Sequence, residues 1–498
     1  MLQPARKFLP EGLSLTFRRL CLLVGVALLA LAVPAASASA TTKGAKRITY
    51  KFGPVDIKPG QNTISLANNN GFPKVPGYIT RFKPDLVRVS DGSIPRVDVL
   101  HLHHAVWLIK GYPQFAAGEE KTIADLPSGY GWRHTPQDRW IMNHMIHNLY
   151  PEPDRVYITY TIDFIPDTSP QAKKMKTVRT QWMDVEGLKP YPVFDVLKNS
   201  GRRGKFTYPN HDPNAYRGEP RRNEWTVGED STLIQTAAHL HPGGLYGDLW
   251  IKRGNRKVRL FRSRAKYYEP AGAVSWDVSM EATPKTWRVA VKKGDVVSVT
   301  GTYDSKRAAW YESMAIMPIA VQPNSTAGVD PFKSPKKVDV RGRVTHGHLA
   351  ENRNHGGRKW TLPDARDLLD GPVMNGGTVN IKGFVYAQGD MVGRGDAGKP
   401  PLVSPGQSLT YFNEDAPRQI EHTITACKAP CNKTTGIAYP LADADVMFDS
   451  GQLGFGPAGI TAAAQRDTWE TPKNLGAGTY TYFCRVHPFM RGSFRVKG

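Results

Sequence analysis

The feature that most constrains the chain is FCRVHPFM, residues 483–490, close to the C-terminus. It places Cys484, His487 and Met490 at steps of three in one short loop, just before the last strand-like run of the sequence. In a type 1 copper site, one thiolate and two imidazoles form a trigonal plane around the ion, and a thioether lies at a longer axial distance. The loop therefore supplies three of the four ligands of such a site, on what we expect to be a rigid β scaffold.

The second imidazole should come from an earlier strand. His422 stands in the alternating run QIEHTITAC (419–427), and it is the only histidine besides His487 after residue 372. Residues 376–498 resemble the cupredoxin (blue copper) family, with a C-x₂-H-x₂-M spacing similar to the amicyanin type. The motifs that carry the resemblance are PGQSLTYFNED (405–415), His422 followed by TIT, FDSG (448–451) and GTYTYFCRVHPFM (478–490). The resemblance implies a Greek-key β-sandwich that holds one type 1 copper on His422, Cys484, His487 and Met490.

The first 40 residues are typical of an export signal. A basic stretch that includes Arg18-Arg19 precedes an apolar run (20–33), and Ala38-Ser39-Ala40 forms a small-residue cleavage site. We therefore expect a mature chain that is secreted, periplasmic or associated with the cell envelope, with no transmembrane segment after signal removal. The arginine pair is compatible with twin-arginine export as well as with a general secretory signal.

Cysteine usage and charge bear on the partners of the chain. An exported chain usually pairs its cysteines. Cys427 and Cys431 are close enough for a local bridge, although a second metal site there stays open, and Cys484 is left as a lone thiol. The formal net charge is +22, its basic residues are scattered, and no segment resembles a nucleic-acid-binding motif. We expect no nucleic acid partner; anionic cell-envelope polymers or an acidic redox partner fit this charge better.

The 47 glycines and 39 prolines favour a turn-rich β architecture. Alternating β-branched and aromatic runs predict strands, and we find no clear amphipathic helix longer than two or three turns. The clearest runs are YITYTIDFI (157–165), TWRVAVKKGDVVSVTGTY (286–303) and AIMPIAV (315–321). We predict an all-β chain with a signal peptide (1–40), two jelly-roll-like β-sandwich domains (41–170 and 171–325), a linker region (326–372) and a cupredoxin domain (373–498).

The N-terminal half carries histidines in tight groups, which are HLHHAVWL (101–108), NHMIHNLYP (143–151) and AAHLHPGG (237–244). In a strand, His-x-His directs both imidazoles to the same face. Adjacent histidines point to opposite faces unless a bulge turns them together. Such polar rings are costly in a core that offers neither a metal nor hydrogen-bond partners.

The order of these groups, followed by WYESMAIM (310–317), resembles the copper type II, ascorbate-dependent monooxygenases, the family of peptidylglycine α-hydroxylating monooxygenase and dopamine β-monooxygenase. The resemblance covers about residues 95–325 and implies two type 2 coppers. By position, it assigns His103, His104 and His147 to an electron-transferring copper, and it assigns His239, His241 and Met314 to an oxygen-binding, catalytic copper.

The chain also departs from that family. It has no cysteine between 41 and 426, and SKRAAWYE (305–312) replaces a histidine-rich segment before the methionine, so substrate and reaction stay open. His144 stays an alternative to His147. We interpret His101 and His134 as structural residues or as hydrogen-bonded residues behind the ligands. His346, His348 and His355 form either a solvated loop or a metal-capturing tract.

Two functions are compatible with these features. The first is an oxidoreductase, a possible copper-dependent monooxygenase that oxidises an unknown small molecule or peptide with O₂. Its blue-copper domain would be the electron inlet for a redox partner or small reductant. The second is a non-enzymatic copper protein, in which the cupredoxin shuttles electrons between outside partners and the histidine-rich domains bind or store copper.

Overall fold

The structure is a computed structural model, and the residues it describes are 42–268, 273, 276–346, 374–375, 377–391, 400–427, 446–454, 466–487 and 489–498. The predicted signal peptide, Cys431, His348 and His355 lie outside these ranges. Residues Thr41–Gly498 form one compact unit. Helix is confined, in the described ranges, to short turns, which are Pro170–Lys174, Ala215–Gly218, α1 (Pro335–Val338) and Ala416–Arg418. The predicted all-β fold is confirmed, and no described helix is long and apolar enough to cross a membrane.

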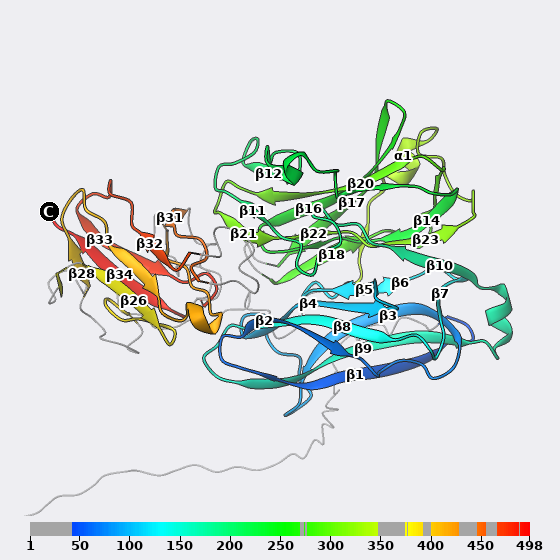
Figure 1. The fold of residues 1–498 in the computed structure, drawn as a ribbon, viewed down its shortest axis with the longest axis horizontal. Coiled ribbons are helices and arrows are strands. Elements are labelled where there is room, and N and C mark those ends of the chain that lie inside the picture. Colours follow the sequence, from blue (N-terminus) through cyan, green and yellow to red (C-terminus); the bar gives the residue numbers. More distant parts are fainter. Residues whose placement is uncertain are drawn as a thin grey trace, which may run out of the picture. The chain divides into compact units, whose positions relative to one another are not determined.

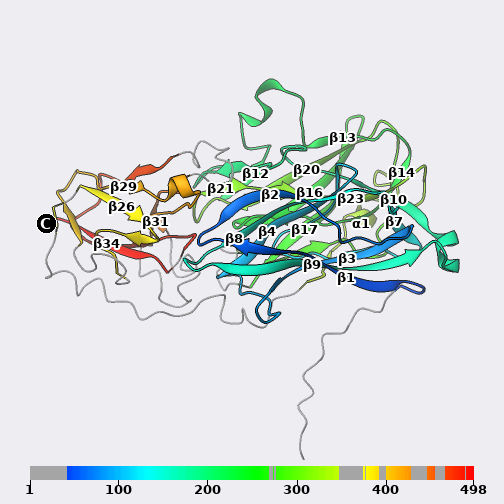
Figure 2. The same ribbon diagram turned by 60° about the horizontal axis from the view of Figure 1, so that its bottom comes forward.

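The first half of the described chain is a sandwich of two sheets (Figures 1 and 2). One sheet has the order β2 (Asn62–Asn68), β8 (Trp140–Asn148), β4 (Leu100–Ile109) and β5 (Tyr112–Ala117). The other begins with β1 (Lys46–Ile57), β9 (Asp154–Pro166), β3 (Gly77–Arg88) and β7 (Tyr130–His134), with β6 (Ala124–Asp125) beside β3. Side chains of both sheets share one apolar core.

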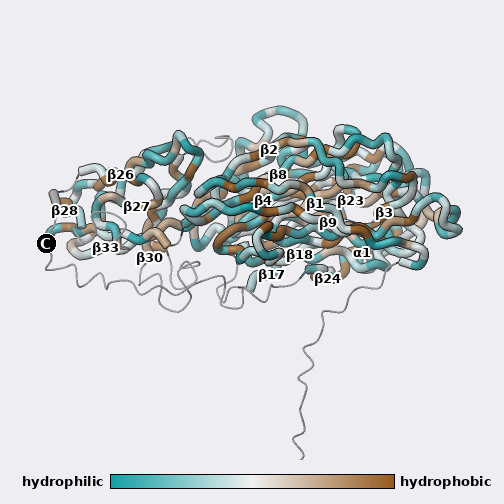
Figure 3. The backbone as a smooth tube through the Cα atoms, turned by 90° about the horizontal axis from the view of Figure 1, so that it is seen from below, coloured by the Kyte–Doolittle hydropathy of each residue, from teal (hydrophilic) through white to brown (hydrophobic). Residues whose placement is uncertain are grey.

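Strand β9 shows why alternation predicts this sandwich. Val156, Ile158, Tyr160 and Ile162 occupy every second position, and all four are fully buried. Since successive side chains of a strand point to opposite faces, this spacing turns one face into the core. The ring of Tyr160 lies 5.3 Å from that of Phe82 on β3. Figure 3 shows hydrophobic segments interspersed with hydrophilic ones along these strands.

One strand links the two predicted jelly-roll-like domains. β10 (Lys176–Gln181) pairs in parallel with β7 and antiparallel with β23 (Ile319–Pro323). The large sheet then continues through β14 (Ser231–Thr236) to β19 (Val289–Val291). A continuous hydrogen-bonded ladder therefore crosses the predicted boundary between residues 170 and 171, and that boundary stays a prediction.

The second half adds a further sheet and two short strand pairs. Within the described ranges the sheet has the order β12 (Lys205–Tyr208), β20 (Val296–Asp304), β16 (Gly244–Arg253), β17 (Arg256–Tyr267), β18 (Val278–Ala282) and β24 (Arg343–Val344), with β13 (Glu224–Thr226) on β20. The short pairs are β11 (Phe194–Val196) with β21 (Trp310–Ser313), and β15 (His239–Leu240) with β22 (Ala315–Ile316). The predicted run 286–303 contains β19 and most of β20, and the run 315–321 covers β22 and the start of β23.

The described part of the predicted linker region packs against the core of the second half. Phe332 and Val338 are buried in the core of the second half, and the indole N–H of Trp287 donates to the Val338 carbonyl at 2.9 Å. Apolar side chains inside this Pro/Lys-rich stretch account for the packing, because their burial removes apolar surface from water.

The C-terminal residues form another sandwich. In the described ranges, one sheet has the order β25 (Met374–Asn375), β28 (Pro401–Val403), β34 (Arg491–Val496), β33 (Gly478–Phe483), β30 (Thr425–Cys427) and β31 (Val446–Asp449). The other has the order β27 (Val385–Tyr386), β26 (Thr378–Lys382), β29 (Thr410–Asn413) and β32 (Thr468–Glu470). Cys427 is disulfide-bonded, whereas Cys484 is free and buried.

Candidate metal centres

The C-terminal sandwich brings three of the predicted type 1 ligands together. His422 precedes β30 and is bridged by its backbone to Leu453, while Cys484 directly follows β33. The loop after Cys484 returns to β34, and two backbone hydrogen bonds close it: Cys484 N–H to the Met490 carbonyl (3.2 Å), and Met490 N–H to the His487 carbonyl (2.8 Å). Paired strands therefore hold both ends of the ligand loop.

The donor atoms are spaced as ligands of one ion would be. The sulfur of Cys484 lies 4.0 Å from Nδ1 of His422 and 3.7 Å from Nδ1 of His487, and the two nitrogens are 3.2 Å apart. Ligands held in a plane at about 2.0–2.3 Å from one ion are about 3.5–4 Å apart. All three side chains are buried, and within the described ranges no other three His, Cys, Asp or Glu residues meet so closely.

Asp415 fixes the orientation of His422. Its Oδ2 lies 3.0 Å from Nε2 of His422, and its carboxylate also accepts the amides of Gly383 and Phe384. Burial would lower the pKa of His422, but the bond to Asp415 raises it. Burial would raise the pKa of Asp415, and the same bond lowers it. The ring N–H therefore sits at Nε2 and leaves Nδ1 for a metal, an arrangement common among metal-ligating histidines.

Backbone amides favour the thiolate form of Cys484. Burial alone would raise the pKa of its thiol, but the amide N–H groups of Thr423 and His487, both 3.3 Å from the sulfur, donate to it and lower the pKa. Met490 is buried in the same apolar cluster as Cys484. A soft, electron-rich thiolate beside two imidazoles suits copper.

In the N-terminal half, β4 carries His101, His103 and His104, and the neighbouring strand β8 carries His147. The β4–β8 register shifts between Leu102 and His104, which is the bulge that adjacent histidines need in order to turn together. The rings of His103 and His104 are 5.7 Å apart. His147 is paired with His101, at 5.1 Å between ring centroids, and lies 6.3 Å from His103.

His239, His241 and Met314 also lie at adjacent positions. β15 and β22 are paired so that His239 faces Ile316, which places His241 and Met314 side by side at the ends of these strands. The hydroxyl of Tyr303 accepts the backbone N–H of both His241 and Met314, each at 3.1 Å. One oxygen atom therefore ties the two positions together.

Hydrogen bonds determine which ring nitrogen of His239 and of His241 is free to bind a metal. Nδ1 of His241 lies 2.7 Å from the carbonyl oxygen of Glu312, and Nδ1 of His239 lies 2.9 Å from Oε2 of Glu120. Both oxygens accept, so each ring carries its proton on Nδ1. In both rings Nε2 is buried and has no hydrogen-bond partner among the described residues. Each ring is therefore held with a free donor atom, as a metal ligand would be.

The two predicted copper sets are not separate in the structure. The ring of His103 lies 4.5 Å from that of His241, and the indole of Trp276 lies within 5.0 Å of both rings and of His101. Burial lowers the pKa of His147 to about 3, so this ring stays neutral, which is the form that binds metals. These histidines lie farther apart than the C-terminal ligands. Among the described residues of the N-terminal half, no three possible donor atoms lie within 4.8 Å of one another.

The remaining histidines lie elsewhere. His104 has Nε2 3.2 Å from the Asn143 amide oxygen and lines a cavity with His239, so its placement gives no support to a shared site with His147. His144 packs on Phe52, away from His147. His134 lies 2.8 Å from the Pro73 carbonyl, in keeping with a structural interpretation.

Sequence reasoning assigned no role to Asp415, Glu120 or Glu312. Glu312 adopts a left-handed backbone conformation (φ 51°), and its carbonyl holds His241. Burial raises the pKa of its carboxyl to about 7. A non-glycine residue in this conformation is unusual and concentrates at functional sites. The only available signals were carboxylates near histidines in sequence, FNEDAPR for Asp415 and YESM for Glu312; for Glu120 there was none.

No family model matches the chain, and a search of curated proteins finds no match. The similar solved structures are of the amicyanin and cupredoxin type. An oxidized amicyanin variant is 21% identical over 28% of this chain and 100% of its own, with a TM-score of 0.16. A purple cupredoxin from Nitrosopumilus maritimus is 19% identical over 24% of this chain and 98% of its own, with a TM-score of 0.15. Similarity this low carries no argument about function.

Proposed function

We propose that the chain is an exported multicopper redox protein. A type 1 copper held by His422, Cys484, His487 and Met490 would pass electrons to type 2 copper at the histidines of the N-terminal half, for O₂-dependent oxidation of a substrate. The observation that carries the proposal is the convergence of one thiol and two imidazoles in a buried site where Asp415 orients His422.

The residues of the C-terminal site fit a copper ion. When bound, copper would supply reversible one-electron transfer at this position. The chain excludes water, because His422, Cys484 and His487 are all buried, and it fixes the ligand loop between paired strands. A scaffold that changes little between oxidation states favours rapid electron exchange.

The contact between the two parts supports an internal electron route. The ring of the ligand His487 lies 6.5 Å from that of His147, which is paired with His101 in the N-terminal cluster. Covalent linkage raises the effective concentration of the donor at its acceptor. The C-terminal copper would therefore be the inlet for electrons from a redox partner or small reductant.

The oxidation itself is assigned to the region of His239, His241 and Met314. In a monooxygenation, the substrate C–H bond and O₂, with two electrons and two protons, give a C–OH bond and one water. The outside reductant supplies both electrons, one at a time, through the C-terminal site. Glu120 and the Glu312 carbonyl would hold His239 and His241 with Nε2 toward the metal.

Metal analysis with visible and electron paramagnetic resonance spectra tests this proposal. We expect about three coppers per chain, one with type 1 and the others with type 2 signals. Cys484→Ser should remove the blue colour and leave the type 2 signals, whereas His239→Ala should remove one type 2 signal and leave the blue colour. A single type 1 copper with no other signal would contradict the enzyme.

One observation favours a second candidate, a non-enzymatic electron-transfer or copper-storage protein. The N-terminal histidines do not bring three donor atoms within 4.8 Å among the described residues. Under this function, type 2 copper would bind loosely and in variable number, and the reduced, copper-loaded protein would consume no O₂ beyond simple reoxidation.

Localisation is also part of the proposal. We place the mature chain in the cell envelope or outside the cell, retained by anionic polymers because it is strongly basic: the full sequence carries a net charge of +22, of which residues 1–40 account for only +3. Moderate salt should release it from the envelope, because salt screens such attraction. Retention that does not depend on salt would contradict this binding mode.

A further inference from the structure

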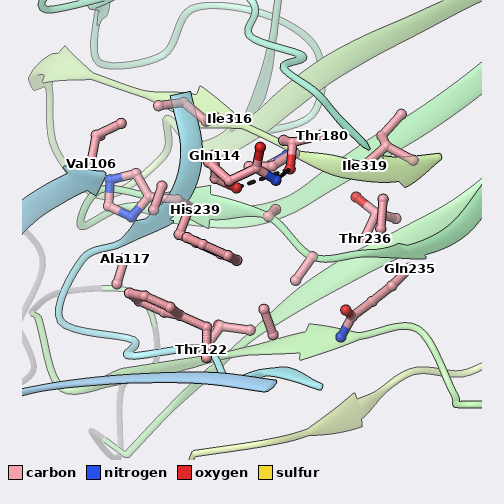
Figure 4. Close-up of a pocket in the computed structure, with 18 of the residues that line it drawn as sticks. Val106, Gln114, Ala117, Thr122, Thr180, Gln235, Thr236, His239, Ile316 and Ile319 are labelled. Carbon is pink, nitrogen blue, oxygen red and sulfur yellow. Dashed lines mark hydrogen bonds between the residues drawn. The ribbon is translucent and has the colours of Figure 1, made fainter. Parts of the chain in front are cut away.

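A cavity of about 90 Å³ lies between strands of the first and second halves of the described chain (Figure 4). Its walls come from β3, β4, β5, β6 and β7 of the first half, from β10, which links the two, and from β14, β15, β22 and β23 of the second. His239, whose Nε2 we assign to a metal, is part of the wall. The cavity therefore joins the candidate oxygen-binding site.

One part of the cavity offers only apolar surface. The rings of Phe82 and Phe115 are stacked at 4.2 Å, and Trp132 meets Phe115 at 5.0 Å. The indole N–H of Trp132 donates to Thr180, and the side-chain amide of Gln114 does the same, so these polar groups are already used. This wall suits an apolar body, and its packed rings need no rearrangement to receive one.

Another part of the wall offers unused hydrogen-bonding atoms. Nδ1 of His104 and the hydroxyl of Thr236 are buried and have no hydrogen-bond partner among the described residues. Figure 4 shows His239 and Thr236 on opposite sides of the pocket. A buried polar atom without a partner is costly, so a ligand that supplies one hydrogen-bonding group is favoured.

The charges of the cavity exclude an anionic ligand. Glu120 is the one lining side chain with a fixed charge, and both its oxygens are occupied. Oε2 binds His239, and Oε1 accepts the amide of Gly118 at 3.0 Å. An anion buried here would find no counter-charge and would lie near the negative charge of Glu120, and burial of an unpaired charge is very unfavourable.

We propose that this cavity binds a small neutral molecule, with an apolar body no larger than a single ring and one hydrogen-bonding group, and that such a molecule is the substrate of the His239 site. The assignment as substrate rests on the proposed function, whereas binding in the cavity does not. Peptides and organic anions are excluded by the same observations.

Calorimetric titration of the copper-free protein with benzyl alcohol tests the binding. Benzoate is a control of the same size that carries a negative charge. We expect benzyl alcohol to bind and benzoate to bind at least about tenfold more weakly, because the cavity offers no positive counter-charge. No binding of benzyl alcohol, or equal binding of benzoate, would overturn the proposal.

Two variants place the ligand in this cavity. Ala320→Leu adds bulk to the wall and should abolish binding of benzyl alcohol. Thr236→Val removes an unpartnered hydroxyl without changing the shape, and it should weaken benzyl alcohol by about threefold to tenfold and leave toluene unchanged. The second variant tests the proposal even if the first fails to fold. Unchanged affinity for benzyl alcohol in Thr236→Val, or full binding by a folded Ala320→Leu, would overturn it.

A spectroscopic arm separates this inference from the proposed function. Benzyl alcohol added to the copper-loaded protein should shift the type 2 resonance signal and leave the blue band unchanged. Binding to the copper-free protein without any such shift would leave the cavity as a ligand site and would overturn its assignment as the substrate site.

Discussion

At the scale of single residues, Asp415 has a large expected effect although it is outside the ligand set. Its carboxylate accepts from Nε2 of His422 and is itself held by two backbone amides. In Asp415→Asn, a neutral amide replaces the charge that favours the metal-binding imidazole. We expect the copper affinity of the C-terminal site to fall by about tenfold to a hundredfold. A competition titration against a copper chelator, followed by the blue band, measures this.

The matched control is Glu414→Gln. Glu414 is the neighbouring carboxylate, but it is partly exposed and pairs with Lys382 at 3.0 Å. This variant should keep the original copper affinity, because surface ion pairs contribute little. Equal losses in the two variants would show that net charge, and not the contact with His422, is responsible.

His144 predicts an acid-sensitive fold. Its ring packs on Phe52, and burial lowers its pKa to about 4. Below pH 6.5 the unfolded chain takes up a proton here while the folded ring stays neutral, so the folded state is penalised as the pH falls from about 6.5 to about 4. The penalty is at most about 3–4 kcal/mol, at about 1.4 kcal/mol per pH unit.

His144→Phe removes the titrating group and keeps an aromatic ring against Phe52. Denaturant unfolding of the copper-free protein at about pH 7 and about pH 5 should show a smaller loss of stability in this variant. If His144→Phe loses stability as steeply as the unmodified chain, the His144 ring is not desolvated.

At the scale of elements, Tyr303 on β20 holds β15 and β22 together. Its hydroxyl accepts two backbone amides and donates to the Met314 carbonyl at 2.5 Å. Tyr303→Phe leaves buried amides without an acceptor, so we expect a loss of about 1–3 kcal/mol in the free energy of unfolding. Because the ends of β15 and β22 carry His241 and Met314, the type 2 copper signal should also weaken, with the blue band unchanged.

Tyr246→Phe, on the neighbouring strand β16, is the control for this experiment and should change neither quantity. Unfolding measurements and copper resonance spectra on the two variants give the comparison. A type 2 signal that persists unchanged in a destabilised Tyr303→Phe protein would show that copper does not depend on the positions of His241 and Met314.

The elements also show how much the sequence could predict. Alternation predicts β9 well, because four apolar side chains at every second position can be buried only on one face of a strand. The adjacent pair His103-His104 likewise pointed to the need for a bulge. Strand β10, KTVRTQ, is short and largely polar, and its partners are far away in sequence, so no local pattern could place it between β7 and β23.

The candidate sites likewise contain residues that the sequence could predict and residues that it could not. Cys484, His487 and His422 could be predicted because soft ligands at fixed spacing are rare, and one tight loop brings two of them together. Whether His101 or His104 lies beside His147 depends on strand register, which the sequence does not specify. Glu120 lies in a loop far from His239 in sequence, so only the folded chain shows that it orients this ring.

At the scale of the whole described unit, the C-terminal sandwich contacts the N-terminal half through residues that are not candidate metal ligands. The side-chain amide of Asn62 donates to Oε1 of Glu421 at 3.1 Å, and the ammonium of Lys198 donates to the Val446 carbonyl at 2.7 Å. His147 and His487 approach in the same unit, at 6.5 Å between ring centroids. These long-range pairs, rather than any ligand, are what would make internal electron transfer possible.

The last prediction follows from that contact. Asn62→Ala removes the only donor that the described residues offer to the buried carboxylate of Glu421, next to the ligand His422, and it changes no candidate ligand. We expect reoxidation of the photoreduced blue copper by the N-terminal half to slow several-fold, because an interface that has lost a buried hydrogen bond spends less time in the close arrangement. Asn68→Ala, at the other end of β2, removes a surface bond to Arg139 and should leave the rate unchanged. Time-resolved decay of reduced blue copper gives both rates. Equal rates in the two variants, with all copper signals intact, would mean that electrons do not cross between His487 and His147.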